Sequence, residues 1–149
     1  MPRTALIVPV REASDHYTGP PGVPAHVTVL FPFMDGADVD EQAVRALLSR
    51  FSAFDFVLDR VERFENGMPW LHPSPSAPFV DLTAAVFERW PDHPPYEGAF
   101  DEVIPHVTIT REDGGQLPIR CRATEVWLIE ERGEEPGAHW VTRLQVPLR

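Results

Sequence analysis

The sequence predicts an α+β fold, because short runs with strand periodicity are interrupted by two segments with helical periodicity. The predicted order is strand, strand, helix, strand, strand, followed by helix, strand, strand, strand. This order suggests two similar halves, each with one helix and one strand that contains a His-x-Thr motif. We therefore expect each helix to cover a mostly antiparallel sheet.

The first predicted half begins with strands of aliphatic and β-branched residues and continues into an amphipathic helix. Asp38 can cap this helix, with Glu41 three residues later as its capping-box partner. The next strand would turn at Asn66 and Gly67 into a short partner strand. The expected ranges are 5–10 and 26–31 for the first strands, 39–52 for the helix, and 54–64 and 68–71 for the hairpin.

A Pro/Ser linker at residues 73–78 leads into the second predicted half. A helix is expected there because apolar residues recur on one side, and a proline-rich stretch ends it. The expected ranges are 79–90 for the helix and 104–110, 124–131 and 140–147 for the strands. The chain suits one domain, residues 1–149, in which the linker near residue 75 could divide two lobes.

The composition excludes several classes of protein and site. The net charge is −10 and all 13 basic residues are arginine, so an extended nucleic-acid surface is not expected. The absence of lysine from the sequence removes Schiff-base and P-loop chemistry. The single cysteine, Cys121, permits no internal disulfide, and we interpret it as a packing residue.

The distribution of apolar residues favours a globular protein without a membrane partner. Apolar residues make up 43% of the chain, which argues against disorder. The longest apolar run near the start, residues 5–10, is too short to cross a bilayer and does not fit a signal peptide. We therefore expect a cytoplasmic location.

Four of the six histidines precede a serine or threonine by two positions, so this spacing alone carries little weight. Two of them, His26 and His106, lie in β-type runs of similar form and follow a proline closely. The other two, His16 and His72, lie among glycine and proline residues, where no strand is expected to fix their geometry. The strand setting therefore singles out the motifs at residues 26–28 and 106–108.

These two motifs suit phosphoester chemistry. Residues i and i+2 of a strand face the same side, so each histidine shares a face with the threonine of its motif. Two imidazoles can serve as general acid and general base near neutral pH. Threonine hydroxyls can donate to non-bridging phosphate oxygens. The predicted catalytic residues are His26 and His106, and the predicted phosphate-binding residues are Thr28 and Thr108.

Other interpretations of the motif pair stay open. Threonine is a good strand former, and the histidines could be ordinary surface residues. A metal hydrolase is a further alternative, but metal sites usually combine three or four ligands, and the repeated motif supplies only two histidines. We therefore expect neither a metal ion nor another cofactor.

With their flanking residues, the two motifs resemble those of the two-histidine (2H) phosphoesterase superfamily, in its 2'-5' RNA ligase-like branch. The resemblance covers nearly the whole chain and is carried by residues 22–33, 90–98, 104–109, 126–129 and 140–148. It implies a bilobal, pseudo-twofold fold of two sheets, with a cleft in which His26 and His106 face each other. In relatives the first histidine usually donates a proton and the second accepts one, which implies these roles here.

The resemblance also implies a substrate class. Relatives usually act on 2',3'-cyclic phosphates or 2'-5' phosphodiesters of nucleotides, and the ligase name reflects a reverse reaction of some members. We accordingly expect metal-independent hydrolysis of such a bond in a small nucleotide or an RNA end, by a two-histidine acid–base mechanism. The alternative is a non-catalytic module that binds phosphorylated nucleotides or RNA ends.

Further residues are candidates for substrate contact. Arg111 follows the second motif where relatives often carry a basic residue, and it could pair with the phosphate. Strand parity would point Arg111 away from the cleft unless the strand has a bulge or ends at Thr110. The Gly/Pro-rich loop that contains His16 and Tyr17 could act as a lid. Three aromatic residues in expected loops could stack on a base or pack in the core, namely Phe33, Trp70 and Tyr96.

Overall fold

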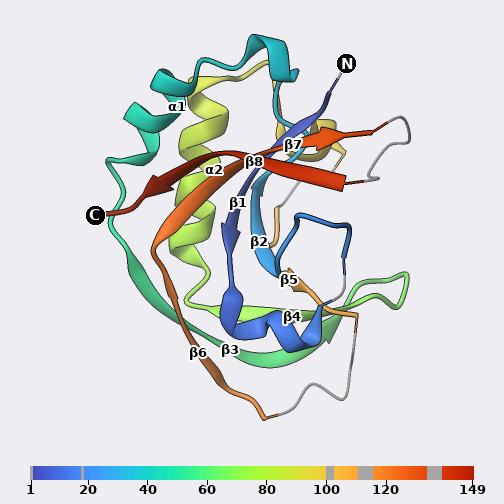
Figure 1. Ribbon diagram of the computed structural model, residues 1–149. Coiled ribbons are helices and arrows are strands. Elements are labelled where there is room, and N and C mark those ends of the chain that lie inside the picture. The colour runs from blue at the N-terminus through green and yellow to red at the C-terminus, as the bar shows by residue number, and fades with distance from the viewer. Residues whose placement is uncertain (1, 18, 100–102, 111–115, 134–138) are drawn as a thin grey trace.

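The computed structural model describes residues 2–17, 19–99, 103–110, 116–133 and 139–149. Eight strands form a single hydrogen-bonded sheet, in the order β6-β3-β4-β5-β2-β1-β7-β8, and two α-helices pack beside it (Figure 1). The strands are β1 (Thr4–Pro9), β2 (His26–Leu30), β3 (Phe54–Arg63), β4 (Pro69–Ser74), β5 (Val107–Thr108), β6 (Ile119–Ala123), β7 (Glu125–Arg132) and β8 (His139–Pro147). The helices are α1 (Glu41–Leu48) and α2 (Ala77–Arg89), with short 3₁₀ helices at Arg11–His16, Gly36–Asp38 and Pro95–Gly98.

The strand pairs in the described residues are all antiparallel, which confirms an α+β fold with a mostly antiparallel sheet. We expected two sheets, but the structure has one. It consists of two four-stranded groups, β6-β3-β4-β5 and β2-β1-β7-β8, which are joined edge to edge where β2 pairs with β5. The groups do not follow the two halves of the chain. Strands β3 and β4 precede residue 75, yet they pair with β5 and β6 from after it.

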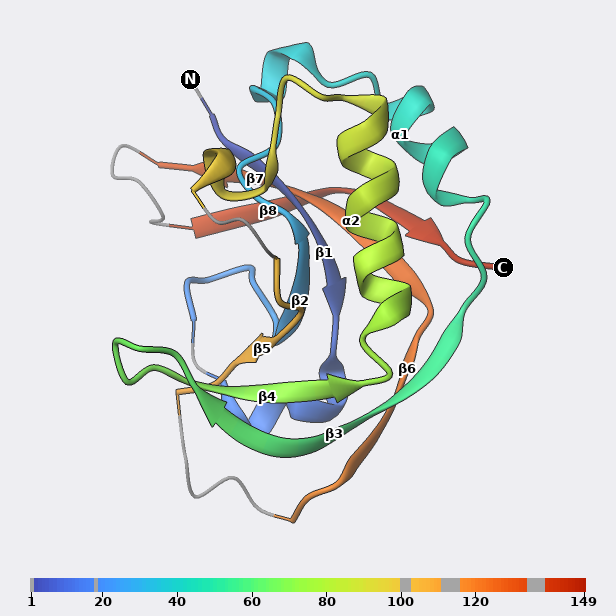
Figure 2. The same ribbon diagram turned by 180° about the vertical axis from the view of Figure 1, so that it is seen from behind.

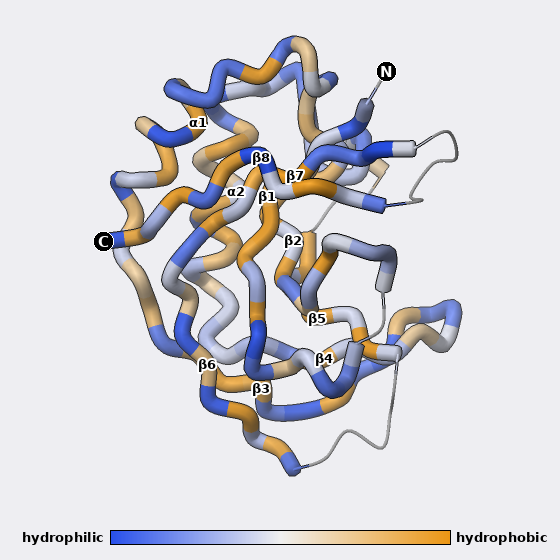
Figure 3. The backbone as a smooth tube through the Cα atoms, viewed as in Figure 1, coloured by the Kyte–Doolittle hydropathy of each residue, from blue (hydrophilic) through white to orange (hydrophobic). Residues whose placement is uncertain are grey.

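The core lies between the sheet and α2, which crosses one face of the sheet with α1 beside it (Figure 2). Thr83 on α2 donates a hydrogen bond from its hydroxyl to the Val29 carbonyl of β2, at 2.7 Å. Val27 and Val29 are buried on this helix side of the sheet. Figure 3 shows the hydrophobic stretch of β1 beside β2 in the interior. The largest fully buried side chains include Phe79, Leu6, Ile7, Leu30, Leu48, Leu58, Leu71 and Leu82.

The first helix is shorter than expected and has a different cap. It spans Glu41–Leu48, and the Asp40 carboxylate accepts a hydrogen bond from the Ala43 N–H at 3.1 Å. The expected cap, Asp38, lies in the preceding 3₁₀ helix instead. The acidic cap therefore exists, but two residues later than the capping-box spacing indicated.

The expected hairpin is present, and its second strand extends further than expected. Strand β4 continues through His72 and Pro73 to Ser74, so much of the expected Pro/Ser linker is strand. This strand lies inside the sheet, between β3 and β5. His72 therefore has the fixed strand geometry that the sequence did not lead us to expect.

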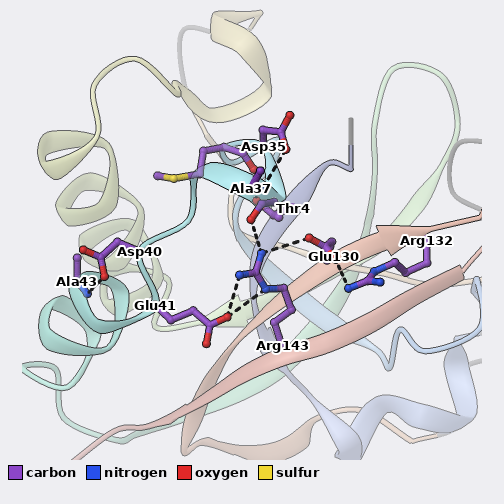
Figure 4. A network of polar contacts seen from close by, with 11 residues as sticks. Thr4, Asp35, Ala37, Asp40, Glu41, Ala43, Glu130, Arg132 and Arg143 are labelled. Carbon is purple, nitrogen blue, oxygen red and sulfur yellow. Dashed lines mark hydrogen bonds and ion pairs between the residues drawn. The ribbon is translucent and has the colours of Figure 1, made fainter.

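The connection after β2 is held to the far end of the sheet by ionic contacts (Figure 4). Arg143 of β8 donates to the Glu41 carboxylate at 2.8 Å, to the Gly36 carbonyl at 2.7 Å and to Glu130 at 3.2 Å. Glu130 is buried and also pairs with Arg132. The network fixes the segment that leaves the strand of the first motif.

In the described part of the chain, no helix has the length and apolar character needed to cross a membrane.

Candidate active site

Strands β2 and β5 bring the two His-x-Thr motifs side by side. Val27 pairs with Val107 in antiparallel register. His26 therefore lies across from Thr108, and Thr28 lies across from His106. Both valines are fully buried toward α2, so the four motif side chains belong to the opposite face of the sheet. The fold thus assembles the predicted quartet on one surface.

The two imidazoles are held in the same way. His26 Nδ1 lies 2.8 Å from the Pro24 carbonyl oxygen, and His106 Nδ1 lies 2.7 Å from the Ile104 carbonyl oxygen. In each case the carbonyl belongs to the residue two positions earlier. A carbonyl only accepts, so each Nδ1 carries the proton and donates it, and Nε2 is the acceptor of the neutral ring. Each histidine can thus exchange a proton through Nε2.

Burial lowers the pKa of both imidazoles. For His26, the Pro24 carbonyl partly opposes the effect and the nearby charge of His106 adds to it. For His106, the Ile104 carbonyl partly opposes the burial effect. Both rings are therefore biased toward the neutral form, and protonation of His106 disfavours protonation of His26. A bound phosphate would favour the protonated form of one of the two rings, because its negative charge opposes both the effect of burial and the repulsion between the rings.

Aromatic rings enclose the two histidines. Tyr17 contacts His26 edge-to-face, with ring centroids 6.0 Å apart. Phe64 contacts His106 in the same way at 5.0 Å, and Trp70 lies 5.9 Å from the His106 ring. Phe64 and Trp70 also stack on each other at 5.3 Å. These contacts restrict the imidazole orientations and account for the burial that lowers their pKa values.

A pocket of about 590 Å³ opens beside His106. Its wall is formed by the tip of the β3–β4 hairpin and by the segment before β5. Tyr96 also lines it, and the Tyr96 side chain hydrogen-bonds the Thr28 side chain. The pocket therefore adjoins both motifs. Its lining residues are Phe64, Glu65, Asn66, Tyr96, Val103, Ile104 and His106.

The other predicted contact residues have different surroundings. Trp70 is buried against His106, and Tyr96 lines the pocket. Phe33 is only 5% exposed and packs edge-to-face on Trp90, as the packing alternative describes. Arg111 lies outside the described residues.

Sequence reasoning missed Phe64 and the strand position of His72. Phe64 and Trp70 flank the Asn-Gly turn of the hairpin, and an aromatic pair across a tight turn is a signal that could have linked them. His72 lies on the same face of β4 as Trp70, and its Nδ1 lies 3.1 Å from the Asp59 carboxylate.

Among the described residues, no group of three or more His, Cys, Asp or Glu side chains has the arrangement of a metal site.

A family model described as the 2'-5' RNA ligase superfamily matches residues 2–146. The chain belongs to the 2'-5' RNA ligase superfamily. No curated protein matches the sequence of this superfamily member.

Solved structures share the fold of this superfamily member at low sequence identity. The apo crystal structure of Escherichia coli LigT has a TM-score of 0.66 at 18% identity, covering 98% of this chain and 96% of that one. A structure described as a phosphoesterase has a TM-score of 0.65 at 17% identity and covers 99% of each chain. The protein TT0787 of Thermus thermophilus has a TM-score of 0.66 at 16% identity, with 99% and 98% covered.

Proposed function

We propose that this superfamily member is a metal-independent phosphodiesterase that hydrolyses a 2',3'-cyclic phosphate or a 2'-5' phosphodiester in a small nucleotide or RNA end. One observation carries the proposal. The Val27–Val107 pair sets two His-x-Thr motifs across from each other, and each histidine directs Nδ1 to a carbonyl and keeps Nε2 for proton exchange. This is the arrangement that a matched general acid and general base require.

The proposed reaction needs two proton transfers. One proton is removed from the attacking water, and one is delivered to the leaving oxygen. Neutral His106 takes a proton from water at Nε2 while the water oxygen attacks phosphorus. The bond between phosphorus and the leaving ribose oxygen breaks, and protonated His26 gives its Nε2 proton to that oxygen. The cycle ends with His106 protonated and His26 neutral, and exchange with solvent restores the starting state.

The assignment of donor and acceptor follows the superfamily pattern. The hydroxyls of Thr28 and Thr108 would donate to the non-bridging oxygens, where negative charge increases in the transition state. Each threonine lies across from the histidine of the other motif, so each would be beside a phosphate bound between the two motifs.

The pocket beside His106 supports a nucleotide substrate. Its volume of about 590 Å³ lies in the usual range for small-molecule sites, about 300–1,000 Å³, and its wall is largely apolar and aromatic. LigT structures were solved with 3'-AMP, ATP and NADP+. We therefore place the nucleoside of the substrate in this pocket and its phosphate between the motifs.

A substrate panel tests the proposal. The panel contains the four 2',3'-cyclic mononucleotides, ADP-ribose cyclic phosphate and 2'-5' dinucleotides. We expect turnover of at least one compound, unaffected by EDTA. His26→Ala and His106→Ala should each lower kcat by about 100-fold or more, as expected for loss of a general acid or base. His139→Ala, which changes an exposed histidine on β8, serves as the control and should retain activity.

Two outcomes contradict the proposal. The first is near-normal turnover by both histidine variants. The second is tight binding of 3'-AMP without turnover of any compound in the panel, which favours the alternative of a non-catalytic nucleotide-binding module. Inhibition by EDTA would contradict metal independence alone.

A further inference from the structure

Two polar residues of the turn between β3 and β4 line the pocket beside His106. The turn lies at the tip of the hairpin (Figure 2). Phe64, whose ring lies 5.0 Å from the His106 ring, is followed directly by Glu65 and Asn66. Glu65 is the only acidic side chain among the described lining residues. In a wall that is otherwise largely apolar and aromatic, such polar groups determine which ligand a pocket accepts.

The turn holds the Asn66 side-chain amide in one orientation. The Met68 N–H donates to Asn66 Oδ1 at 3.0 Å, so the amide oxygen is engaged and the amide nitrogen is the end that can donate to a ligand. The Gly67 N–H donates to the Phe64 carbonyl at 2.8 Å, and Gly67 has a φ of 88°, in the left-handed region that favours glycine. Arg63 also donates to the Gly67 carbonyl at 3.0 Å. The wall of the pocket therefore offers a fixed N–H₂ donor.

The Glu65 carboxylate has the opposite hydrogen-bonding character. An ionised carboxylate only accepts, and its two oxygens can bind two parallel N–H groups at once. In the described part of the chain, this carboxylate has no hydrogen-bond or ion-pair partner. Its negative charge also repels a ligand that carries a phosphate. A nucleotide is therefore favoured here only where its base brings N–H donors to the carboxylate.

Among the common RNA bases, guanine matches this combination of acceptor and donor. Its Watson–Crick edge carries two adjacent donors, N1–H and the 2-amino group, and beside them the acceptor O6. The two donors suit the Glu65 carboxylate, and O6 suits the Asn66 amide nitrogen. Adenine in the same pose presents the lone pair of N1 to the carboxylate and its 6-amino donor to the amide nitrogen. Uracil and cytosine lack two adjacent donors on this edge.

We propose that the pocket selects guanine, with the Glu65 carboxylate accepting from N1–H and the 2-amino group and the Asn66 amide donating to O6. This inference rests on the proposed function, since it takes the substrate to be a nucleotide whose phosphate lies between the two motifs. It deepens that function by naming the base. The rings of Phe64 and Tyr96, which also line the pocket, are available to the faces of the base.

Kinetics with the 2',3'-cyclic phosphates of guanosine, inosine and adenosine test the base preference. Inosine keeps N1–H and O6 and lacks only the 2-amino group. For wild type, kcat/KM should be about tenfold higher with the guanosine compound than with the adenosine compound, and the inosine compound should lie between them. Glu65→Gln should lower kcat/KM about tenfold for the guanosine compound and less than about twofold for the adenosine compound. Glu88→Gln, which removes the same charge from an exposed position on α2, is the control and should keep the wild-type preference.

Asn66→Asp tests the second contact while preserving the turn. Aspartate keeps an oxygen for the Met68 N–H and replaces the N–H₂ donor with an acceptor. The guanosine compound should lose about tenfold in kcat/KM, because its O6 then faces a carboxylate. The adenosine compound should lose less, because its 6-amino group gains an acceptor. Equal kcat/KM for the three compounds in wild type, or equal losses for guanosine and adenosine in both variants, overturn the inference.

Calorimetry with 3'-GMP and 3'-AMP separates this inference from the proposed function, because binding needs no turnover. Tighter binding of 3'-GMP that Glu65→Gln abolishes supports the inference even if no compound is hydrolysed, a result that contradicts only the proposed function. Turnover without a base preference overturns the inference and leaves the proposed function in place. An absence of both turnover and nucleotide binding in the wild type overturns both.

Discussion

Val27 of β2 lies directly opposite Val107 of β5, and both side chains are fully buried on the helix side of the sheet. This pair sets the register between β2 and β5, the strands at which the two four-stranded groups are joined. Side chains alternate along a strand, so a slip of one residue would turn the histidine and threonine of one motif into the core. The geometry of the face that carries the two motifs therefore depends on the burial of two valines on the opposite face.

Val107→Ala should accordingly impair both stability and activity. Loss of two buried methyl groups next to α2 should lower the free energy of unfolding by about 2 kcal/mol. Activity should fall as well, because β5 is only two residues long and Val107 is its pairing residue on both sides, opposite Val27 of β2 and Leu71 of β4. Urea unfolding checks the first effect. Val61→Ala, at a position that is 38% exposed on β3, is the matched control and should cost much less. Equal losses in the two variants would contradict this role of Val107.

The local structure of the motifs could be predicted from the sequence because it depends on alternation within one strand. Val27 and Val29 are apolar and His26 and Thr28 are polar, and this pattern alone determines which face each occupies. The same reasoning correctly indicated helices near α1 and α2 and the Asn-Gly hairpin. Such features need only neighbouring residues.

The features that the sequence did not reveal depend on contacts between distant segments. Pro73 and Ser74 look like a linker, but β4 continues through them because both residues pair with β3. Phe64 contacts His106 only because the hairpin lies beside β5, which no local pattern indicates. The order of strands in the sheet is likewise a non-local property.

The lowered pKa values of the two motif histidines make stability depend on pH. In the unfolded chain their pKa is about 6.5. The native state has lower values, so between the two values the unfolded chain binds more protons and the free energy of unfolding falls as pH falls. Wild type should therefore lose stability as pH is lowered below about 6.5, and the double variant His26→Gln, His106→Gln should lose less. Urea unfolding at pH 6.5, about one unit above it and about one unit below it, measures the free energy of unfolding of both proteins. A double variant with the slope of the wild type would show that these histidines are not the cause, and His139→Gln controls for loss of a histidine.

Arg143 should contribute far more to stability than an exposed arginine. Arg143→Met leaves the buried carboxylate of Glu130 without one of its two partners, and it breaks the contact with Glu41. We expect the free energy of unfolding to fall by about 3 kcal/mol, which is typical of removing one member of a buried ion pair. Arg122→Met is the matched control, because Arg122 pairs with Asp55 at 2.8 Å and both side chains are more than half exposed. It should cost less than about 1 kcal/mol. Thermal and urea unfolding of the two variants give the comparison, and similar losses would refute it.

Cys121 should be unreactive in the folded protein. Burial, and then the negative charge of Glu12, raise the pKa of its thiol to about 12. The thiolate is the reactive species, so near neutral pH almost none is present. A disulfide reagent such as DTNB should leave the native protein unmodified, while the urea-unfolded chain should release one equivalent of chromophore rapidly. Cys121→Ala should keep kcat/KM close to that of wild type, since the thiol lies on β6 among core residues. Rapid labelling of the native protein would show that the thiol is accessible and ionised, and a large loss of activity in Cys121→Ala would contradict its role as a packing residue.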